Sequence, residues 1–208
     1  MKYFDLLNKE SSNPVINEAY KYALDNNVPI ITDDGLLCLT TIIKIKKAKR
    51  ILEIGTAIAY CAMQMADLDD EIVIDTIERK KEMYELARNN VNNANMQDRI
   101  NLIFGDALEV EIDENIKYDI IFIDAAKSQY IKFFEKFEKH LNKDGIIVSD
   151  NLLFHGLIEN ETDTVGKDLR AMLRKIRNYN EWLKNNDLYD TTFLRIGDGM
   201  AISIKKWN

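Results

Sequence analysis

Short apolar segments alternate with longer amphipathic segments along most of the chain. The apolar segments cover residues 51–54, 72–77, 100–104, 118–123 and 145–149. Such nearly continuous apolar runs are typical of parallel strands that are buried on both faces. Between them, residues 60–68, 79–94 and 128–141 carry apolar side chains at helical spacing. This alternation predicts an α/β fold with a doubly wound sheet.

The two ends of the chain follow other patterns. Residues 1–27 are predicted to form an N-terminal helical region, and Thr32 is placed to cap the helix that follows it. A polar loop, residues 151–163, leads into a helix that reaches about Lys184. Residues 191–196 and 200–204 flank Gly197-Asp198-Gly199, which predicts an antiparallel hairpin. No linker or repeat is visible, so we expect one domain over residues 1–208.

Composition is that of an ordinary globular protein. The 208 residues are 46% hydrophobic and 30% charged, which suits one core. No apolar run is long enough for a membrane span, and no signal peptide is visible. The two cysteines, Cys38 and Cys61, form no CxxC pattern, so a reducing cytoplasm is the expected location. The net charge of −7 argues against a broad nucleic-acid-coating surface but leaves room for a local basic patch.

The turn after the first apolar strand is a candidate ligand site. Residues 51–54 run into Gly55 and then into a helical pattern. A strand, a tight turn and a helix N-terminus often hold a nucleoside cofactor, and glycine lets the backbone approach a ligand closely. Glu78 ends the next strand, 25 residues after Glu53, where a carboxylate commonly accepts hydrogen bonds from ribose hydroxyls. The strand and glycine alone fit a plain core connection equally well.

Three further strand ends carry oxygen-bearing side chains. They are Asp106 after residues 100–104, Asp124 after residues 118–123, and the pair Asp150 and Asn151 after residues 145–149. Because ligands of open α/β sheets bind outside the carboxyl ends of the strands, we expect these side chains to converge. Asp124, Asp150 and Asn151 offer only oxygen ligands, which suit Mg²⁺, Ca²⁺ or Mn²⁺ better than zinc. Each residue alone also fits a helix cap.

Six motifs in order carry a family resemblance, and together they span nearly the whole chain from Pro29 onward. They are ILEIGTAIAY (51–60), TIERKKE (76–82), FGDALE (104–109), FIDAAKSQY (122–130), SDNLLFHG (149–156) and IGDGMAIS (196–203). This set resembles the bacterial metal- and SAM-dependent O-methyltransferases related to catechol O-methyltransferase. Within that family, FIDAAKSQY and residues 189–203 look most like the tRNA 5-hydroxyuridine methyltransferases. The resemblance implies a seven-stranded Rossmann-like methyltransferase sheet that ends in the antiparallel hairpin.

The resemblance also implies roles for individual residues, with S-adenosylmethionine (SAM) as the methyl donor and Mg²⁺ as the metal. The metal positions are Asp124, Asp150 and Asn151, and the catalytic lysine is Lys127. The expected donor-binding residues are Thr32, Glu53, Gly55, Cys61, Glu78, Asp106, Ala107 and Asp124. Two positions depart from the family pattern, because Ala59 and Cys61 stand where glycine and serine are usual. A thiol is a weaker donor than a hydroxyl, which puts donor binding by Cys61 in question.

The reaction implied by the resemblance is methylation of 5-hydroxyuridine to 5-methoxyuridine in the anticodon region of tRNA. Lys127 is expected to remove the hydroxyl proton while the metal favours the anion. One alternative is O-methylation of a small catechol or phenolic substrate, which the acidic net charge favours slightly. A second alternative, prompted by Ala59 and Cys61, is a SAM-binding protein without catalytic activity. The N-terminal helices are expected either to cover the cofactor or to form the contact of a homodimer.

Basic residues along two predicted helices are the candidate contacts for tRNA. They are Lys127, Lys132, Lys136, Arg170, Arg174, Lys175 and Arg177. Charge runs of this kind are more often the solvated faces of helices. Tyr130 and Phe154 are placed to stack on a base, although packing is their commoner role. His155 lies in the loop after the predicted metal pair, either at the edge of the substrate pocket or as an ordinary loop residue.

Overall fold

A computed structural model, which describes residues 11–159 and 166–206, contains one seven-stranded sheet with the order β3-β2-β1-β4-β5-β7-β6. Strands β1 to β5 are parallel, whereas β7 runs antiparallel to both β5 and β6. This topology confirms the predicted doubly wound sheet with its C-terminal hairpin. The strands are β1 Arg50–Ile54, β2 Val73–Glu78, β3 Ile100–Phe104, β4 Tyr118–Ile123, β5 Leu141–Ser149, β6 Tyr189–Leu194 and β7 Met200–Lys205.

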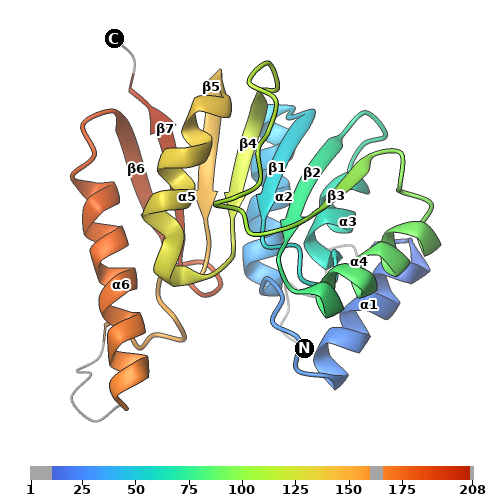
Figure 1. Cartoon of the computed structure of the whole chain (residues 1–208), viewed down its shortest axis with the longest axis horizontal. Helices are drawn as coiled ribbons and strands as arrows, with labels where there is room; N and C mark the ends of the chain where they lie inside the picture. The colour runs from blue at the N-terminus through green and yellow to red at the C-terminus, as the bar shows by residue number, and fades with distance from the viewer. Residues whose placement is uncertain (1–10, 160–165, 207–208) are drawn as a thin grey trace.

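Helices cover both faces of the sheet (Figure 1). The helices are α1 Pro14–Asp25, α2 Asp33–Lys46, α3 Tyr60–Ala66, α4 Lys81–Asn93, α5 Tyr130–Phe137 and α6 Lys167–Lys184, with 3-10 turns η1 Lys127–Gln129 and η2 Glu138–His140. Alternate strand residues point to opposite faces, so Ile51 packs with α1 to α4 while its neighbour Leu52 packs with α5 and α6. Among the described residues no helix is both long enough and apolar enough to cross a membrane.

Several boundaries differ from those predicted, and three of them have a clear structural origin. Residues 128–141 were expected to form one helix, but the segment divides into η1, α5 and η2. Strand β5 begins at Leu141, four residues before the expected start, because Leu141 pairs with Tyr118 ahead of an irregularity in the β4–β5 register. Helix α1 begins at Pro14, where Asn13 caps it by accepting a hydrogen bond from the Val15 amide at 3.0 Å. The predicted N-terminal helical region also includes residues 1–10, which lie outside the described part of the chain.

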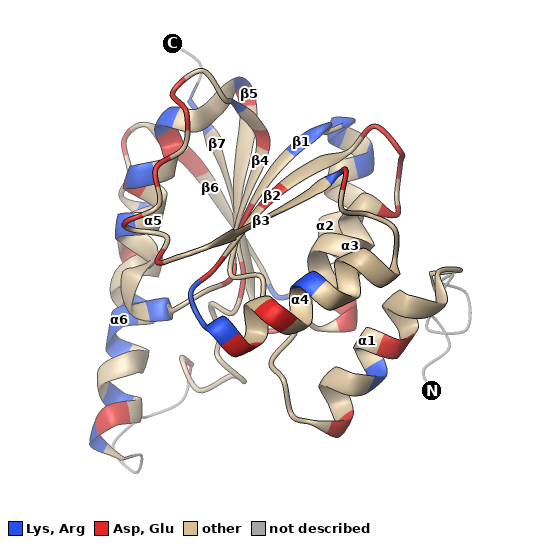
Figure 2. Cartoon of the chain, turned by 45° about the vertical axis from the view of Figure 1, so that its right-hand side comes forward, with Lys and Arg blue, Asp and Glu red and all other residues tan. Residues whose placement is uncertain are grey.

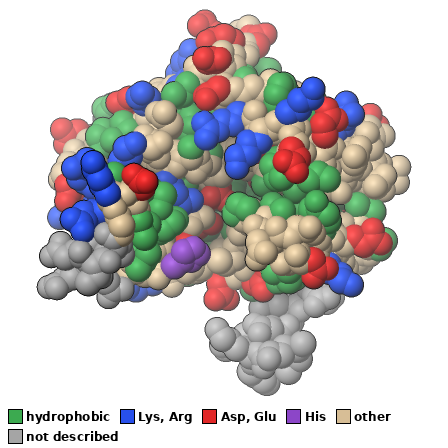
Figure 3. Space-filling view, turned by 60° about the horizontal axis from the view of Figure 1, so that its bottom comes forward, with side chains coloured by type: hydrophobic (Ala, Val, Ile, Leu, Met, Phe, Trp, Pro, Cys, Tyr) green, Lys and Arg blue, Asp and Glu red, His purple; other side chains and the backbone are tan. Residues whose placement is uncertain are grey.

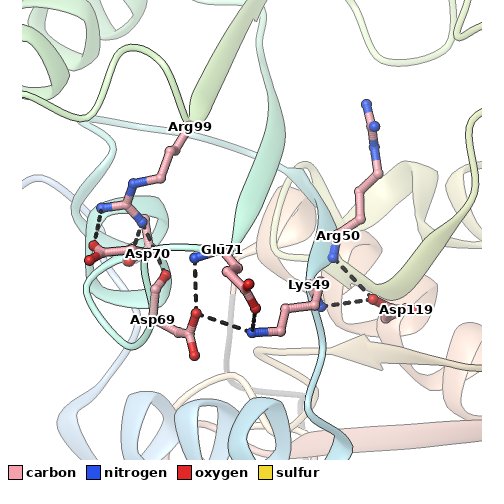
Figure 4. A network of polar contacts seen from close by, with 8 residues as sticks. Lys49, Arg50, Asp69, Asp70, Glu71, Arg99 and Asp119 are labelled. Atoms are coloured by element: carbon pink, nitrogen blue, oxygen red, sulfur yellow. Dashed lines mark hydrogen bonds and ion pairs between the residues drawn. The ribbon is translucent and has the colours of Figure 1, made fainter.

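A polar network joins the amino ends of β1 and β4 (Figure 4). The backbone amides of Lys49 and Arg50 donate to Oδ2 of Asp119 at 2.8 and 3.0 Å. Burial alone would raise the pKa of Asp119, but these hydrogen bonds outweigh it and hold the pKa below its ordinary value. The neighbouring ion pairs of Lys49 with Asp69 and Glu71 are exposed, so they add little stability. Asp119 is therefore the main polar tie at this edge.

The strand order places β1 beside β4 at the centre of the sheet. Helix α3, which follows β1, and helix α5, which follows β4, lie on opposite faces. The chain therefore leaves the two strands in opposite directions and opens a crevice at their carboxyl ends, at the bottom of Figure 1. The polar strand ends that the sequence predicts to converge all lie at this edge.

Candidate active site

A cavity of about 300 Å³ occupies the crevice at the carboxyl ends of the strands. The predicted site residues that line it are Glu53, Gly55, Cys61, Glu78, Asp106, Ala107, Asp124, Lys127 and Asn151. Asp150 is fully buried beside the cavity and does not line it. Thr32 is exposed and caps α2, accepting a hydrogen bond from the Gly35 amide at 3.2 Å; it does not line the cavity, and its donor-binding role stays a prediction. Figure 3 shows this end of the molecule, with basic side chains bordering its central hollow.

Gly55 lets β1 and β4 approach closely at the floor of the cavity. Its φ is +107°, and a Cβ added there would lie 2.1 Å from the carbonyl oxygen of Asp124. The amide of Asp124 donates to Ile54 O at 3.0 Å, and the amide of Asp150 donates to Ile123 O at 3.1 Å. The ends of β1, β4 and β5 are thus fixed side by side. Any side chain at position 55 would push Asp124 away.

A buried chain of polar groups runs under the cavity from Glu53. Thr76 Oγ1 donates to Glu53 Oε2 at 2.5 Å, and the hydroxyls of Thr76 and Thr56 lie 2.6 Å apart. Glu53 Oε1 is buried without a hydrogen-bond partner. Burial raises the pKa of Glu53 to about 8, although the bond from Thr76 works the other way. A buried carboxyl with a free oxygen beside a cavity is suited to bind a cationic group of a ligand.

Cys61 lies beside Glu53 in the cavity wall. Burial, followed by the charge of Glu53, raises the pKa of the thiol well above its ordinary value. The thiol is therefore protonated and acts as a weak hydrogen-bond donor. Ala59, the other departure from the family pattern, caps α3 with a φ of +64°, a conformation that favours glycine. It is fully buried, so its methyl group lies in the core.

Glu78 connects the end of β2 with the turn after β1. Its Oε2 accepts from the Ala57 amide at 2.9 Å, and its Oε1 accepts from the Lys80 amide at 2.7 Å. A carboxylate has about four acceptor positions, so each oxygen keeps one for a ligand hydroxyl. Farther along the wall, Asp106 Oδ1 accepts from the Leu108 amide at 2.9 Å, which closes the turn that holds Ala107.

Asp124, Asp150 and Asn151 come together as predicted. Asn151 Nδ2 lies 3.3 Å from Asp124 Oδ1, and both carboxylate oxygens of Asp150 are buried without a hydrogen-bond partner. Burial raises the pKa of Asp124 and, together with the charge of Asp124, that of Asp150. Lys127 is the nearby cation at 4.0 Å from Asp124, and the two carboxyls together with the Asn151 amide oxygen fit a hard divalent cation that keeps several waters. In the described part of the chain, no group of three or more His, Cys, Asp or Glu residues is arranged to hold a metal.

Lys127 lies at the mouth of the cavity in a sheltered position. Its Nζ is 4.0 Å from Asp124 Oδ1 and 6.0 Å from the ring centroids of both Tyr130 and Phe154. Tyr130 is buried, and its hydroxyl donates to the carbonyl of Asp150 at 3.2 Å. Packing is therefore the role that the structure gives Tyr130, whereas Phe154 is only partly buried beside Lys127.

Sequence reasoning missed one residue near the site. Asp198 is 7% exposed, and its charge contributes to the raised pKa of both Asp124 and Asp150. In the sequence it appears only as the middle of a Gly-Asp-Gly hairpin turn, which is a common sequence at exposed turns. No local pattern distinguishes an exposed turn from one that is buried against another loop.

Comparisons with known proteins agree with this geometry. A sequence profile described as O-methyltransferase matches residues 10–206. Caffeoyl-CoA O-methyltransferase from Populus kitakamiensis is 29% identical over 189 residues, which cover 88% of this chain and 80% of that protein. A Staphylococcus aureus structure, provisionally named a caffeoyl-CoA O-methyltransferase, is 40% identical with a TM-score of 0.89, covering 95% of this chain and 93% of that one. The O-methyltransferase from Bacillus cereus, solved in complex with SAH, is 26% identical with a TM-score of 0.79. The match covers 97% of this chain and 93% of that one.

Proposed function

The chain belongs to the O-methyltransferase family, and from this membership we propose that it transfers the methyl group of SAM to the 5-hydroxyl of 5-hydroxyuridine in tRNA, with Mg²⁺ at Asp124, Asp150 and Asn151. Binding of SAM is supported by the related Bacillus cereus protein, which was solved with SAH, the product left when SAM loses its methyl group. The cavity at the carboxyl edge has the ribose-binding carboxylate of Glu78 and the free oxygen of Glu53 in its wall. A SAM-binding protein without catalytic activity would share these features, so the methyl-transfer assay below distinguishes that alternative.

In the proposed reaction, the chain's own residues position the reactants and move one proton. SAM supplies a methyl group on a sulfonium, and Mg²⁺ when bound would favour the anion of the acceptor hydroxyl. Lys127, in its neutral form, takes the proton of that hydroxyl, and Asp124 at 4.0 Å then stabilises the resulting ammonium. The rings of Tyr130 and Phe154 shield this lysine from water. Holding the methyl donor in line with the acceptor oxygen supplies a further large part of the rate acceleration.

The observation that carries the choice of tRNA is the charge of α6. In a protein of net charge −7, this helix has six basic residues and two acidic ones. The basic residues are Lys167, Arg170, Arg174, Lys175, Arg177 and Lys184. Helix α6 packs against η1, which begins with Lys127, and Figure 2 shows its Lys and Arg positions as blue segments of the ribbon. Phosphate groups of a nucleic acid bind to such a basic helix, whereas a small catechol has no charge to place there.

Two of the predicted tRNA contacts serve the protein itself. Lys136 Nζ donates to the carbonyls of Leu108 and Val110 at 2.8 and 2.6 Å, and Arg177 donates to the carbonyl of Ile158. Of the remaining candidates, Lys132, Arg174 and Lys175 are exposed on α5 and α6. We assign the phosphate contacts to this smaller set.

O-methylation of a small phenolic substrate is the second candidate. It is favoured by the relatives named as caffeoyl-CoA O-methyltransferases, at 29% and 40% identity. Both acceptors present two adjacent oxygens, the 5-hydroxyl and 4-carbonyl of the modified uracil or the two hydroxyls of a catechol. The proposed metal site suits either pair, so the site itself does not separate the two substrates.

Methyl transfer from labelled SAM tests the proposal. The acceptors are tRNA that carries 5-hydroxyuridine, the same tRNA without this modification, and a catechol, each with Mg²⁺ and with a chelator. Chelator-sensitive label in the modified tRNA alone is the expected result. Label in catechol alone would replace tRNA by a phenolic substrate and leave the donor and metal sites in place. Cofactor binding without transfer to either acceptor would contradict both proposals.

A further inference from the structure

The tip of the β6–β7 hairpin is inserted between two segments of the site. Gly197 and Gly199 both have a left-handed conformation, with φ of +57° and +87°. A Cβ on Gly197 would lie 2.2 Å from Thr32 Oγ1, and one on Gly199 would lie 2.6 Å from Leu153 Cγ. The two glycines therefore let the tip fit between the start of α2 and the loop after β5. Asp198, between them, is nearly buried at 7% exposure.

The loop after β5 is bonded to this tip through three backbone amides. The Leu152 amide donates to Gly199 O at 2.9 Å, and the Leu153 amide donates to Asp198 O at 2.8 Å. The third amide is that of His155, and its hydrogen bond is accepted by Oδ1 of the Asp198 side chain. The His155 ring nitrogen Nδ1 also lies 3.5 Å from Asp198 Oδ2. The carboxylate of Asp198 is thus the one side chain of the hairpin tip that binds this loop.

The same loop contains an unusual concentration of left-handed residues. Asn151, Phe154, His155 and Gly156 have φ values of +68°, +45°, +55° and +75°. For the three residues with side chains this conformation costs free energy, and it persists only where the surroundings enforce it. The His155 amide donates to Asp198 from within this left-handed stretch. The hydrogen bond to Asp198 is therefore one of the contacts that keep the loop strained.

The strained loop carries two groups that face the proposed chemistry. Asn151 at its start lies against Asp124 at 3.3 Å, and the ring of Phe154 lies 6.0 Å from Lys127 Nζ. If the loop relaxed, both groups would move away from their partners. A carboxylate is a stronger acceptor for the His155 amide than a neutral group, because charge-assisted hydrogen bonds are the stronger class.

We propose that Asp198 is a positioning residue, which holds the loop of residues 151–156 so that Asn151 and Phe154 stay in place beside Asp124 and Lys127. The expected effect on turnover rests on the proposed function, whereas the expected effect on the position of the loop does not. Asp198 itself does not line the cavity, and its Oδ1 accepts the hydrogen bond from the loop. Removing it should loosen metal binding and slow turnover, while the donor end of the cavity around Glu53 and Glu78 stays intact.

The test compares Asp198→Ala and Asp198→Asn with wild-type protein. Three quantities are measured: Mn²⁺ affinity by electron paramagnetic resonance, SAH affinity by calorimetry, and kcat with the acceptor that wild type uses. Asp198→Ala should lower both Mn²⁺ affinity and kcat about 10- to 100-fold, as loss of a residue that orients a metal ligand does. SAH affinity should stay within about twofold, because the substitution leaves Glu53 and Glu78 in the donor wall and does not alter Gly197, the tip residue that packs against Thr32. Asp198→Asn keeps an oxygen acceptor for the His155 amide and should recover most of both losses.

Asp190→Asn is the matched control, because Asp190 is exposed on the same hairpin. It should leave all three quantities unchanged. The proposal is overturned if Asp198→Ala binds Mn²⁺ and turns over like wild type, or if Asp198→Asn is as impaired as Asp198→Ala. The proposal is also overturned if Asp198→Ala lowers SAH affinity and melting temperature along with activity. If wild type methylates neither acceptor, the proposed function fails and the Mn²⁺ titration alone decides the role of Asp198. Wild-type protein that binds no Mn²⁺ overturns both.

Discussion

Lys127 Nζ lies 4.0 Å from Oδ1 of Asp124, with both side chains less than one-fifth exposed. The distance is too long for a hydrogen bond but close enough for the charges to interact. The amine of Lys127 therefore lies on the acceptor side of the cavity, next to one of the proposed metal ligands. The pair therefore links the proposed metal site to the proposed base.

Replacing Lys127 by Ala should lower kcat by about 10²- to 10⁴-fold, the usual range for a general base. SAH affinity should change little, because Glu53, Glu78 and the rest of the donor wall are untouched. Single-turnover methylation and calorimetry measure the two effects separately. Lys143→Ala, an exposed lysine near the amino end of β5 and away from the cavity, is the control and should behave like wild type. A Lys127→Ala enzyme with normal kcat would exclude this residue as the base.

Mg²⁺ should stabilise the protein more at pH 8 than at pH 6. Burial raises the pKa of Asp124 and Asp150, so the folded protein without metal binds more protons than the unfolded chain at neutral pH. Stability without metal should therefore fall as pH rises through the raised pKa values. Binding of Mg²⁺ requires both carboxylates in their charged form, so its affinity rises with pH.

Thermal unfolding with Mg²⁺ and with a chelator, from pH 5.5 to 8.5, measures this effect. A concentration near 100 times the dissociation constant should add about 2.7 kcal/mol to the free energy of unfolding. The Asp150→Asn variant should lose most of this increment. An increment that is independent of pH, or equal in Asp150→Asn, would argue against a metal held by these carboxylates.

Replacing Arg174 by Ala should weaken tRNA binding without affecting a small acceptor. Arg174 is exposed on α6, so its loss removes at most a phosphate contact. We expect KM for tRNA to rise several-fold and the slope of log(kcat/KM) against log salt to become shallower by about 1. Lys184→Ala, at the other end of the helix, is the matched control. Equal effects of both variants would indicate general charge attraction, and no effect of either would remove α6 from the tRNA interface.

Asp119→Ala should lower the free energy of unfolding by about 1 to 3 kcal/mol at pH 7, because it leaves the Lys49 and Arg50 amides without their acceptor. The folded pKa of Asp119 lies below its ordinary value, so its contribution is present above the unfolded pKa and is lost as pH falls through the folded pKa. Denaturant unfolding at several pH values should show the two proteins converging in acid. A constant difference across pH would mean that lost packing, not the carboxylate, causes the effect.

The sequence predicts most of the fold because its buried strands are local apolar runs that end at polar residues. Strands β3 and β4 begin and end where expected, and the convergence of Asp124, Asp150 and Asn151 follows from strand order alone. The early start of β5 at Leu141 was not predictable, because it depends on pairing with Tyr118. For the same reason the sequence did not reveal Asp198, whose burial depends on a loop more than forty positions away.

Insertion of the hairpin tip beside the β5 loop has a consequence for synthesis of the protein on the ribosome. The parallel strands β1 to β5, with Glu53, Glu78, Asp124 and Asp150, all emerge before residue 150, whereas the tip that holds the last loop emerges about fifty residues later. Until then the edge of β5 has no β7 to pair with, and the loop after it has no hairpin to bind. A nascent chain that stalls before the hairpin therefore carries the donor wall but lacks the contacts that shape the acceptor side. Completion of the active site therefore waits for the hairpin tip at residues 197–199, so a chain that stalls before it lacks the arrangement proposed for methyl transfer.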